Sequence, residues 1–359
     1  MSDSTTPPTT PHAPLNNDLM EVSDAARLVK SPLVSVLMVA YNHADYLAYA
    51  IEGVISQQCD FSFELVIGED ASSDETKEIA LDYQRRYPAI IRVIHSTANV
   101  GAGANFKRIV SKARGEYVAF CDGDDYWCVT HKLAGEVELI RHNPDVGVVH
   151  TDWVRSHVEG GRWIVAWGKY VHRRVPRSLL EGDVFSTFHY PKILRSCTVL
   201  FRRSVVLECA ASELGRKKYK FGDAVLAAYT ASRWKVAYLP EVTAVYRESP
   251  NSALRSGKQA RLDFLKSSLE FDTDARRFFA DRPDYPRAYR WEVAVGLFLW
   301  SISARNAETA KFALADICAH FGVIDFIAAG WHTLVMRRPS LRRQQRYVSG
   351  TSTHETSVG

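Results

Sequence analysis

The chain has 359 residues, of which 46% are hydrophobic and 24% charged, with a formal net charge of +4. This composition is typical of a soluble globular protein with room for more than one packed unit. The small positive charge gives no support for a nucleic-acid partner. The six cysteines include no Cys-x-x-Cys pair. They favour reduced thiols in a cytoplasmic protein over a disulfide framework or a zinc site.

The N-terminal end shows no secretory signal, because residues 1–14 are rich in Ser, Thr and Pro and have no apolar core. No run of 18 apolar residues predicts a transmembrane helix. We expect a disordered tail over residues 1–30, with a short helix near residues 18–29 as the alternative.

The C-terminal end combines an apolar stretch at residues 322–335 with a basic cluster at residues 337–346. One interpretation is a last core helix followed by a solvated basic tail. The other is a peripheral contact with the anionic inner face of the cell membrane. We expect a helical region over residues 257–340 and a polar tail over residues 341–359.

Residues 31–145 alternate short apolar runs with amphipathic segments. The expected strands cover residues 33–40, 63–68, 90–95 and 116–120. The expected helices lie between them, at residues 45–58, at residues 74–87, and from the flexible loop at residues 99–105 through residue 113. Strands and helices that alternate in this way predict an α/β fold with a single, Rossmann-like, mostly parallel sheet and helices on both faces.

Residues 146–256 are more irregular. We expect strands at residues 146–150, 163–166, 197–201, 235–239 and 242–247, with a helix that begins at Phe221-Gly222-Asp223. From residue 259 the pattern is mainly helical, with a break at residues 281–286.

Three carboxylates crowd into four positions directly after the strand expected at residues 116–120: Asp122, Asp124 and Asp125. Like charges this close repel, and a bound Mg²⁺ or Mn²⁺ ion would offset that cost. The alternative is a solvated acidic turn. Asn42, Glu69 and Asp70 follow other expected strands, and ligands of parallel sheets bind at such strand ends.

Taken in order, these motifs resemble the family 2 glycosyltransferases with the GT-A fold, from residue 32 to residue 256. The motifs that carry the resemblance are the first strand into Ala40-Tyr41-Asn42, the acidic turn at residues 69–76, Asn99-Val100-Gly101, residues 122–127 with Lys132-Leu133, residues 196–203, residues 221–226, Tyr238-Leu239-Pro240 and Val245-Tyr246-Arg247.

The resemblance divides the domain into a nucleotide-binding half (31–145) and an acceptor-binding half (146–256). It implies that Asp124 binds a divalent metal, that Asp122 contacts the ribose and also the metal, and that Asp70, with Glu69, reads the nucleotide base. Tyr41 is expected to stack on the base and Asn42 to contact the nucleotide. Helix capping or a plain turn is the alternative for Asp70 and Asn42.

Asp223 matches the position of the catalytic base, with a helix-capping aspartate as the alternative. A single base implies in-line attack with inversion. The implied reaction moves a sugar from a nucleoside-diphosphate sugar to a glycan or lipid-linked acceptor in the assembly of a bacterial surface polysaccharide. A non-catalytic sugar-nucleotide or glycan-binding module on the same fold is the alternative.

Four positions depart from the family pattern. Glu69 stands where the family usually has Asp, Ala71 stands at a usual glycine, Gly222 replaces an acidic residue before the base, and no histidine follows Arg247 where relatives often have one. The arginines Arg202, Arg203 and Arg247 are candidates for phosphate binding, with solvated surface arginines as the alternative.

Overall fold

The computed structural model describes residues 19–167, 172, 175–189, 194–248 and 257–322. The strands are β1 (Met20–Val22), β2 (Val34–Ala40), β3 (Phe63–Glu69), β4 (Ile91–His95), β5 (Tyr117–Phe120), β6 (Tyr126–Trp127), β7 (Val146–Glu159), β8 (Arg162–Val165), β9 (Val199–Arg202) and β10 (Lys235–Arg247). The helices are α1 (Ala44–Ile55), α2 (Thr76–Arg86), α3 (Ala102–Lys112), α4 (Lys132–Arg141), α5 (Arg203–Ala211), α6 (Glu213–Arg216), α7 (Asp223–Ala231), α8 (Lys258–Phe278), α9 (Arg287–Ser303) and α10 (Ala307–His320).

The strands form one sheet in the order β1-β4-β3-β2-β5-β9-β7-β10-β6, and β8 pairs with β7. The parallel arrangement expected for the first half is confirmed, because β4, β3, β2 and β5 all run parallel. The second half joins this sheet through antiparallel pairs of β9 with β5 and β7, while β7 and β10 run parallel. The carboxyl ends of β2, β3 and β5 therefore meet at one edge.

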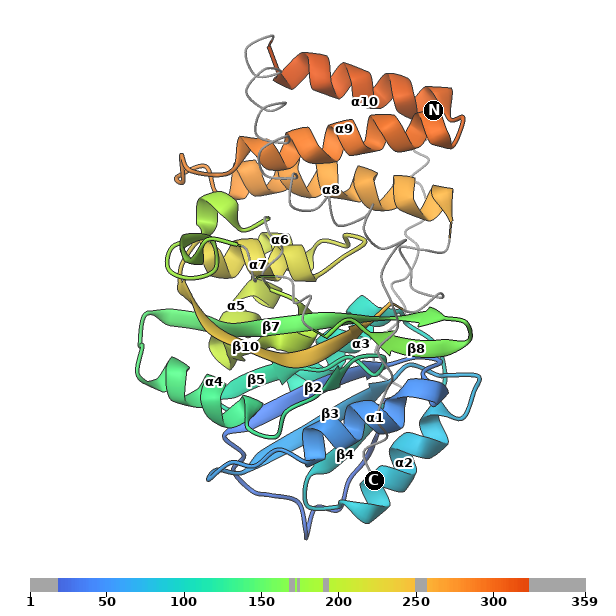
Figure 1. Ribbon diagram of the computed structural model, residues 1–359, viewed down its shortest axis with the longest axis vertical. Coiled ribbons are helices and arrows are strands. Elements are labelled where there is room, and N and C mark those ends of the chain that lie inside the picture. The colour runs from blue at the N-terminus through green and yellow to red at the C-terminus, as the bar shows by residue number, and fades with distance from the viewer. Residues whose placement is uncertain (1–18, 168–171, 173–174, 190–193, 249–256, 323–359) are drawn as a thin grey trace, which may run out of the picture.

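The sheet is buried on both faces, so its central strands are mostly apolar. Side chains alternate across it: Val36 and Leu65 belong to the core under α1, α2 and α4, whereas Leu37 and Val66 belong to the core that includes α3, α5 and α7. In Figure 1, α5, α6 and α7 separate the sheet from α8, α9 and α10, which are stacked at one end of the molecule.

The disordered tail expected over residues 1–30 includes residues that the structure shows to be part of the sheet. Met20–Val22 form the edge strand β1, antiparallel to β4, where we expected disorder or a short helix. An ion pair explains why this short segment is ordered, because the Arg92 Nη2 atom of β4 lies 2.9 Å from the Glu21 carboxylate. No local periodicity in the sequence signals a strand of three residues held by a distant partner.

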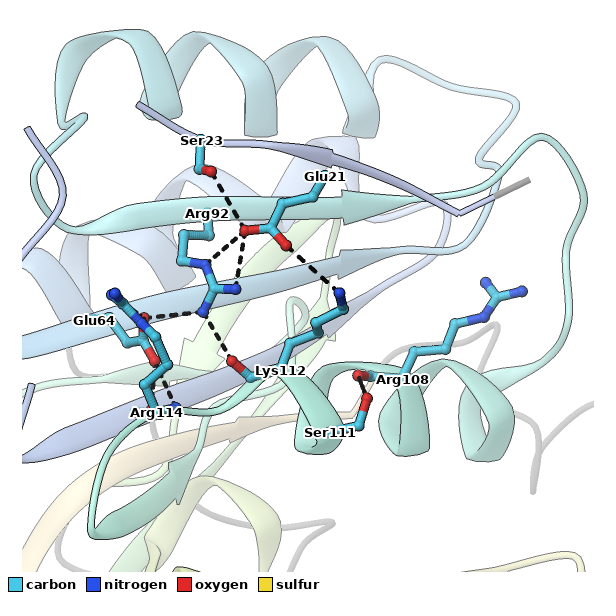
Figure 2. A network of polar contacts seen from close by, with 9 residues as sticks. Glu21, Ser23, Glu64, Arg92, Arg108, Ser111, Lys112 and Arg114 are labelled. Atoms are coloured by element: carbon cyan, nitrogen blue, oxygen red, sulfur yellow. Dashed lines mark hydrogen bonds and ion pairs between the residues drawn. The ribbon is translucent and has the colours of Figure 1, made fainter. Parts of the chain in front are cut away.

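A network of buried charges lies at the amino ends of the parallel strands, away from the carboxyl edge (Figure 2). Glu64 has no exposed surface, and it accepts hydrogen bonds from the Ser35 hydroxyl at 2.7 Å, from Arg92 Nη1 at 3.1 Å and from the backbone and guanidinium of Arg114. These bonds tie β2, β3 and β4 to the α3–β5 turn. The network stabilises the amino ends of these strands and so helps to fix the position of their carboxyl ends.

The second half differs from expectation at β10. We expected two strands, at residues 235–239 and 242–247, but one strand spans both, with register shifts against β7 on either side of Val242. Pro240 lies at this irregularity, as expected for a residue that cannot donate to a ladder. The strand β9 begins two residues later than predicted, because Ser196–Thr198 form a 3₁₀ turn.

The three C-terminal helices pack on each other through an apolar core that includes Leu262, Leu297 and Ile317. Arg290 lies inside this bundle and forms ion pairs with Asp272 and Asp316. The described helices include none that is long and apolar enough to span a membrane. The basic cluster at residues 337–346 and nearly all of the apolar stretch at residues 322–335 lie outside the described residues.

Candidate functional site

Two turns meet at the carboxyl ends of β2 and β3. The Asn42 backbone N–H donates to Ser72 Oγ at 3.0 Å, and its side-chain Oδ1 accepts from the Ser73 backbone N–H at 2.9 Å. Asn42 adopts a left-handed conformation with φ of 54°, which asparagine tolerates better than most residues. Asn42 therefore holds the first turn against the second. Tyr41, beside it, is 45% exposed and available to a ligand.

The Glu69-Asp70 pair is buried, and its carboxylates already have partners. The two oxygens of Asp70 accept hydrogen bonds from the backbone N–H groups of Val100 and Gly101, at 2.9 and 2.8 Å. A direct contact from Asp70 to a nucleotide base requires a further hydrogen bond to one of these oxygens. Glu69 Oε1 accepts from the Ser72 N–H at 2.6 Å, while its buried Oε2 has no protein partner.

The turn after β5 gives its three carboxylates different surroundings. Asp122 is half-buried, and its Oδ2 accepts a 2.7 Å hydrogen bond from Ser196 Oγ. Burial and the neighbouring Asp124 carboxylate raise the pKa of Asp122 to about 6. Asp125 is fully buried and accepts the Arg247 backbone N–H at 3.0 Å. Asp125 thus supports the turn, whereas Asp122 and Asp124 are left to face a ligand.

Burial also raises the pKa of Asp124, although the nearby Arg247 guanidinium acts in the opposite direction. Among the residues that the structure describes, no three His, Cys, Asp or Glu side chains are grouped as a metal site. The carboxylate oxygens of Asp122 and Asp124 suit a hard cation such as Mg²⁺ or Mn²⁺. These two carboxylates can hold such a cation when other oxygens, such as those of a diphosphate, complete the coordination shell of the ion.

Asp223 is the first residue of α7, and its side chain is exposed. Its Oδ1 accepts the Ala224 backbone N–H at 2.9 Å. The Asp223 charge is among the influences that raise the pKa of Asp122, after burial and Asp124. It also contributes, after burial, to the raised pKa of Tyr289. The Asp223 charge therefore acts on both Asp122 in the acidic turn and Tyr289 in α9.

The sequence analysis missed His43. An ideal Cβ at Gly123 would lie 2.8 Å from His43 Nδ1, so the glycine is needed for the histidine to pack against the acidic turn. Burial lowers the pKa of His43, against the charges of Asp122 and Asp74. In the sequence, the only indication that His43 belongs to the site is its position directly after Asn42.

Two of the three arginines considered for phosphate binding lie elsewhere. Arg202 donates to the backbone carbonyls of Val146 and Ile140, at 2.8 and 3.0 Å, and so holds β9 to the α4–β7 turn. The Arg203 N–H donates to the Glu116 carbonyl, before the start of β5. This is the amino end of the strand, so the phosphate hypothesis is wrong for both residues. Arg247 lies beside Asp124.

The structure is that of an α/β protein with a cluster of carboxylates at the carboxyl edge of its sheet. Residues 35–206 match the family model described as glycosyl transferase family 2. The chain therefore contains a family 2 glycosyltransferase domain.

Two curated relatives show the extent of the sequence likeness. An uncharacterised protein of Mycobacterium tuberculosis is 40% identical over 115 residues, which are 32% of this chain and 33% of that protein. A Bacillus subtilis protein, TuaG, provisionally named a teichuronic acid biosynthesis glycosyltransferase, is 35% identical over 109 residues, or 30% of this chain and 42% of TuaG. The chain thus covers about a third of the length of the first relatives that it matches.

The mannosyltransferase PcManGT of Pyrobaculum calidifontis, solved with GDP-Man and Mn²⁺, superposes with a TM-score of 0.52 at 18% identity. The superposition covers 89% of this chain and 85% of PcManGT. At this identity the likeness concerns the fold alone, which is the GT-A fold predicted from the sequence.

Proposed function

We propose that this protein is a metal-dependent, inverting glycosyltransferase that moves a sugar from a nucleoside-diphosphate sugar to a hydroxyl of a glycan or a lipid-linked saccharide. The observation that carries the proposal is that the first half of the domain (residues 31–145) and the second half (residues 146–256) interact at Asp122. This carboxylate follows β5, accepts a hydrogen bond from Ser196 and is influenced by the charge of Asp223. These contacts support a donor site and a base on the same side of the sheet.

Asp223 is the proposed catalytic base. Its side chain is exposed and lies at the start of a helix, so it can reach an acceptor hydroxyl. A carboxylate there takes the proton as the hydroxyl attacks the anomeric carbon from the side opposite the diphosphate. One displacement of this kind inverts the anomeric configuration, and no carboxylate nucleophile is required.

The donor is proposed to bind along the carboxyl edge, with its base near Tyr41, Asn42, Glu69 and Asp70 and its ribose near Asp122. Asp124, with Asp122, would hold the Mg²⁺ or Mn²⁺ ion. A bound cation of this kind neutralises the negative charge that grows on a leaving diphosphate. The complex of PcManGT with GDP-Man and Mn²⁺ supports this assignment by analogy of fold.

The biological setting is proposed from the sequence relatives. TuaG carries a name that refers to teichuronic acid biosynthesis, and this supports a role in surface polysaccharide assembly. The proposed location is the cytoplasm, with a peripheral contact at the inner face of the cell membrane. Deletion of residues 337–359 is expected to reduce binding to anionic liposomes and to leave nucleotide binding unchanged. Equal liposome binding by both forms would exclude a peripheral membrane contact through these residues.

The test of function measures binding and transfer separately. Thermal shift against UDP, GDP, ADP, CDP and dTDP, with Mn²⁺ or with EDTA, should show stabilisation by one of them that is larger with Mn²⁺, because a ligand of the native state raises its stability. Sugar nucleotides of that base are then incubated with the protein and candidate acceptors. A protein that binds the sugar nucleotide but never turns it over would be the non-catalytic module instead.

A further inference from the structure

Arg247 is the last residue of β10, and it contacts two successive residues of the acidic turn. Its backbone N–H donates to Asp125 Oδ1 at 3.0 Å, and its Nη1 forms a long hydrogen bond of 3.5 Å to the Asp124 carbonyl oxygen. The contact follows from strand pairing, because Val245 of β10 lies opposite Tyr126 of β6. The end of β10 is thus attached to the residues that carry the proposed metal ligand.

The Arg247 guanidinium is surrounded by an aromatic cage, defined by four rings from three elements: α1, β6 and β8. The distances from its Cζ to the ring centroids are 4.6 Å for Tyr126, 5.1 Å for Tyr49, 5.5 Å for Tyr46 and 5.8 Å for Trp163. Arginine stacks well on aromatic faces because its cation is planar and weakly hydrated. The cage restrains the guanidinium in one place, and only 7% of Arg247 is exposed.

We propose that Arg247 is a positioning residue for cation binding: it fixes the backbone of the acidic turn so that the Asp124 carboxylate is held ready for Mg²⁺ or Mn²⁺. This inference rests on the proposed function. The aromatic cage restrains the guanidinium, the guanidinium contacts the Asp124 carbonyl, and the Arg247 N–H fixes Asp125. Residues that orient a metal ligand through hydrogen bonds contribute substantially to metal affinity.

A purely structural role is disfavoured by the cost of burying this charge. An apolar side chain of similar volume would fill the space between four rings without desolvating a cation. The burial lowers the pKa of Arg247, and the aromatic rings and carboxylates around it act in the opposite direction. What the arginine adds over an apolar residue is a fixed donor directed at the acidic turn.

The experiment compares wild type, Arg247→Gln, Arg247→Lys and the control Arg233→Gln. Arg233 is also stacked on two rings, Tyr229 and Phe278, but it is exposed and lies in the turn after α7. The tighter of the two probes UDP and GDP is titrated by calorimetry in Mn²⁺ and in EDTA. Arg247→Gln should weaken binding in Mn²⁺ by about tenfold or more and leave binding in EDTA unchanged.

Arg247→Lys keeps the charge but loses the planar group, so its affinity in Mn²⁺ should fall between those of wild type and Arg247→Gln. Arg233→Gln should bind as wild type. Unchanged binding by Arg247→Gln in Mn²⁺ would overturn the proposal. An equal loss in Mn²⁺ and in EDTA would also overturn it, because Arg247 would then contact the nucleotide itself. If neither probe binds, the same titrations use ADP, CDP and dTDP, and failure of the wild type to bind any of the five would refute the proposed function, and this inference with it.

A second pair of variants covers the case in which Arg247→Gln does not fold, as judged by circular dichroism. Tyr49 is 63% exposed, so its ring can be removed without opening the core. Tyr49→Ala should weaken Mn²⁺-dependent probe binding about two- to fivefold, the size of one exposed cation–π contact, while Tyr49→Phe keeps the ring and should bind as wild type. Equal binding by Tyr49→Ala and Tyr49→Phe would contradict the role of the aromatic cage.

Discussion

The Ser196 hydroxyl donates a 2.7 Å hydrogen bond to the Asp122 carboxylate, although the two residues lie 74 positions apart in the chain. Ser196 begins the 3₁₀ turn before β9, and β9 pairs with β5, the strand that leads into Asp122. The antiparallel pair between the two halves of the sheet thus places a residue of the second half in contact with a carboxylate of the first half.

Replacement of Ser196 by alanine should weaken donor binding. The variant leaves a half-buried carboxylate oxygen without its donor, and a hydrogen bond to a charged group contributes about 1.5–3 kcal/mol. We expect the Kd for the donor nucleotide to rise by about tenfold or more, with a melting temperature of the ligand-free protein that is lower by several degrees. The control is Ser111→Ala, which removes an exposed hydroxyl bonded to the Arg108 carbonyl. Equal donor affinity in both variants would show that this bond does not shape the donor site.

The sequence predicted the features that depend on neighbours along the chain. The buried strands of the first half, the acidic turn and the start of α7 at Asp223 all follow from local patterns of apolar and polar residues, and the structure contains them. The convergence of Asn42 with the turn at Ser72 and Ser73 followed from the parallel order of the strands.

The features that were missed depend on distant partners. The role of Arg247 against Asp124 and Asp125 needs the pairing of β10 with β6, and a two-residue strand such as β6 has no periodicity to detect. The strand β1 likewise depends on Arg92. No local pattern indicates which residue a buried charge will meet across the sheet.

Ala71→Gly should stabilise the protein. Ala71 has a φ of 57°, and the left-handed conformation costs a non-glycine residue about 1–2 kcal/mol. Glycine removes that strain but adds about 0.4–1 kcal/mol of unfolded-state entropy. The expected net gain is therefore about 0.5–1 kcal/mol in the free energy of unfolding, measured with urea. Ala80→Gly in the interior of α2 should instead cost about 1 kcal/mol, and a loss in both variants would mean that Ala71 is not strained.

Removal of the Glu64 carboxylate should destabilise the fold strongly. Glu64→Ala leaves the Arg92 and Arg114 guanidinium groups without their shared buried partner (Figure 2). Breaking a buried ion pair from one side costs about 3–5 kcal/mol. The matched control is Asp82→Ala, which breaks exposed pairs with Arg85 and Arg86 and should cost less than about 1 kcal/mol. Similar urea midpoints for the two variants would contradict a structural role for the Glu64 network.

His150 should make the fold sensitive to acid. It is fully buried, its Nε2 lies 2.7 Å from the Leu180 carbonyl oxygen, and burial lowers its pKa to about 4. Between this value and the usual pKa of about 6.5, the unfolded chain binds a proton that the folded protein does not. Above about pH 6.5 the free energy of unfolding therefore has the full contribution of neutral His150. It falls as the pH drops towards 4, by up to about 3 kcal/mol.

The measurement is the free energy of unfolding in urea at several pH values between 7 and 4. His150→Gln keeps a donor for the Leu180 carbonyl but does not titrate, so its stability should fall less steeply with acid than that of the wild type. His142→Asn removes an exposed histidine and should follow the wild-type curve. Identical curves for all three proteins would exclude His150 as a source of the acid sensitivity.

Asp223→Asn should separate chemistry from binding. Asparagine keeps the shape of the side chain and can still accept the Ala224 N–H, but it cannot take a proton from an acceptor hydroxyl. Loss of a general base typically lowers the rate by ~10²–10⁴, while the affinity for the donor should hardly change. Calorimetry with the donor and a transfer assay on the same preparation test both parts. Transfer at the wild-type rate would leave Asp223 as a helix residue without a catalytic role. Glu248, which pairs with Arg155, and His189, whose ring lies 5.7 Å from that of Tyr289, would then be the next residues to replace.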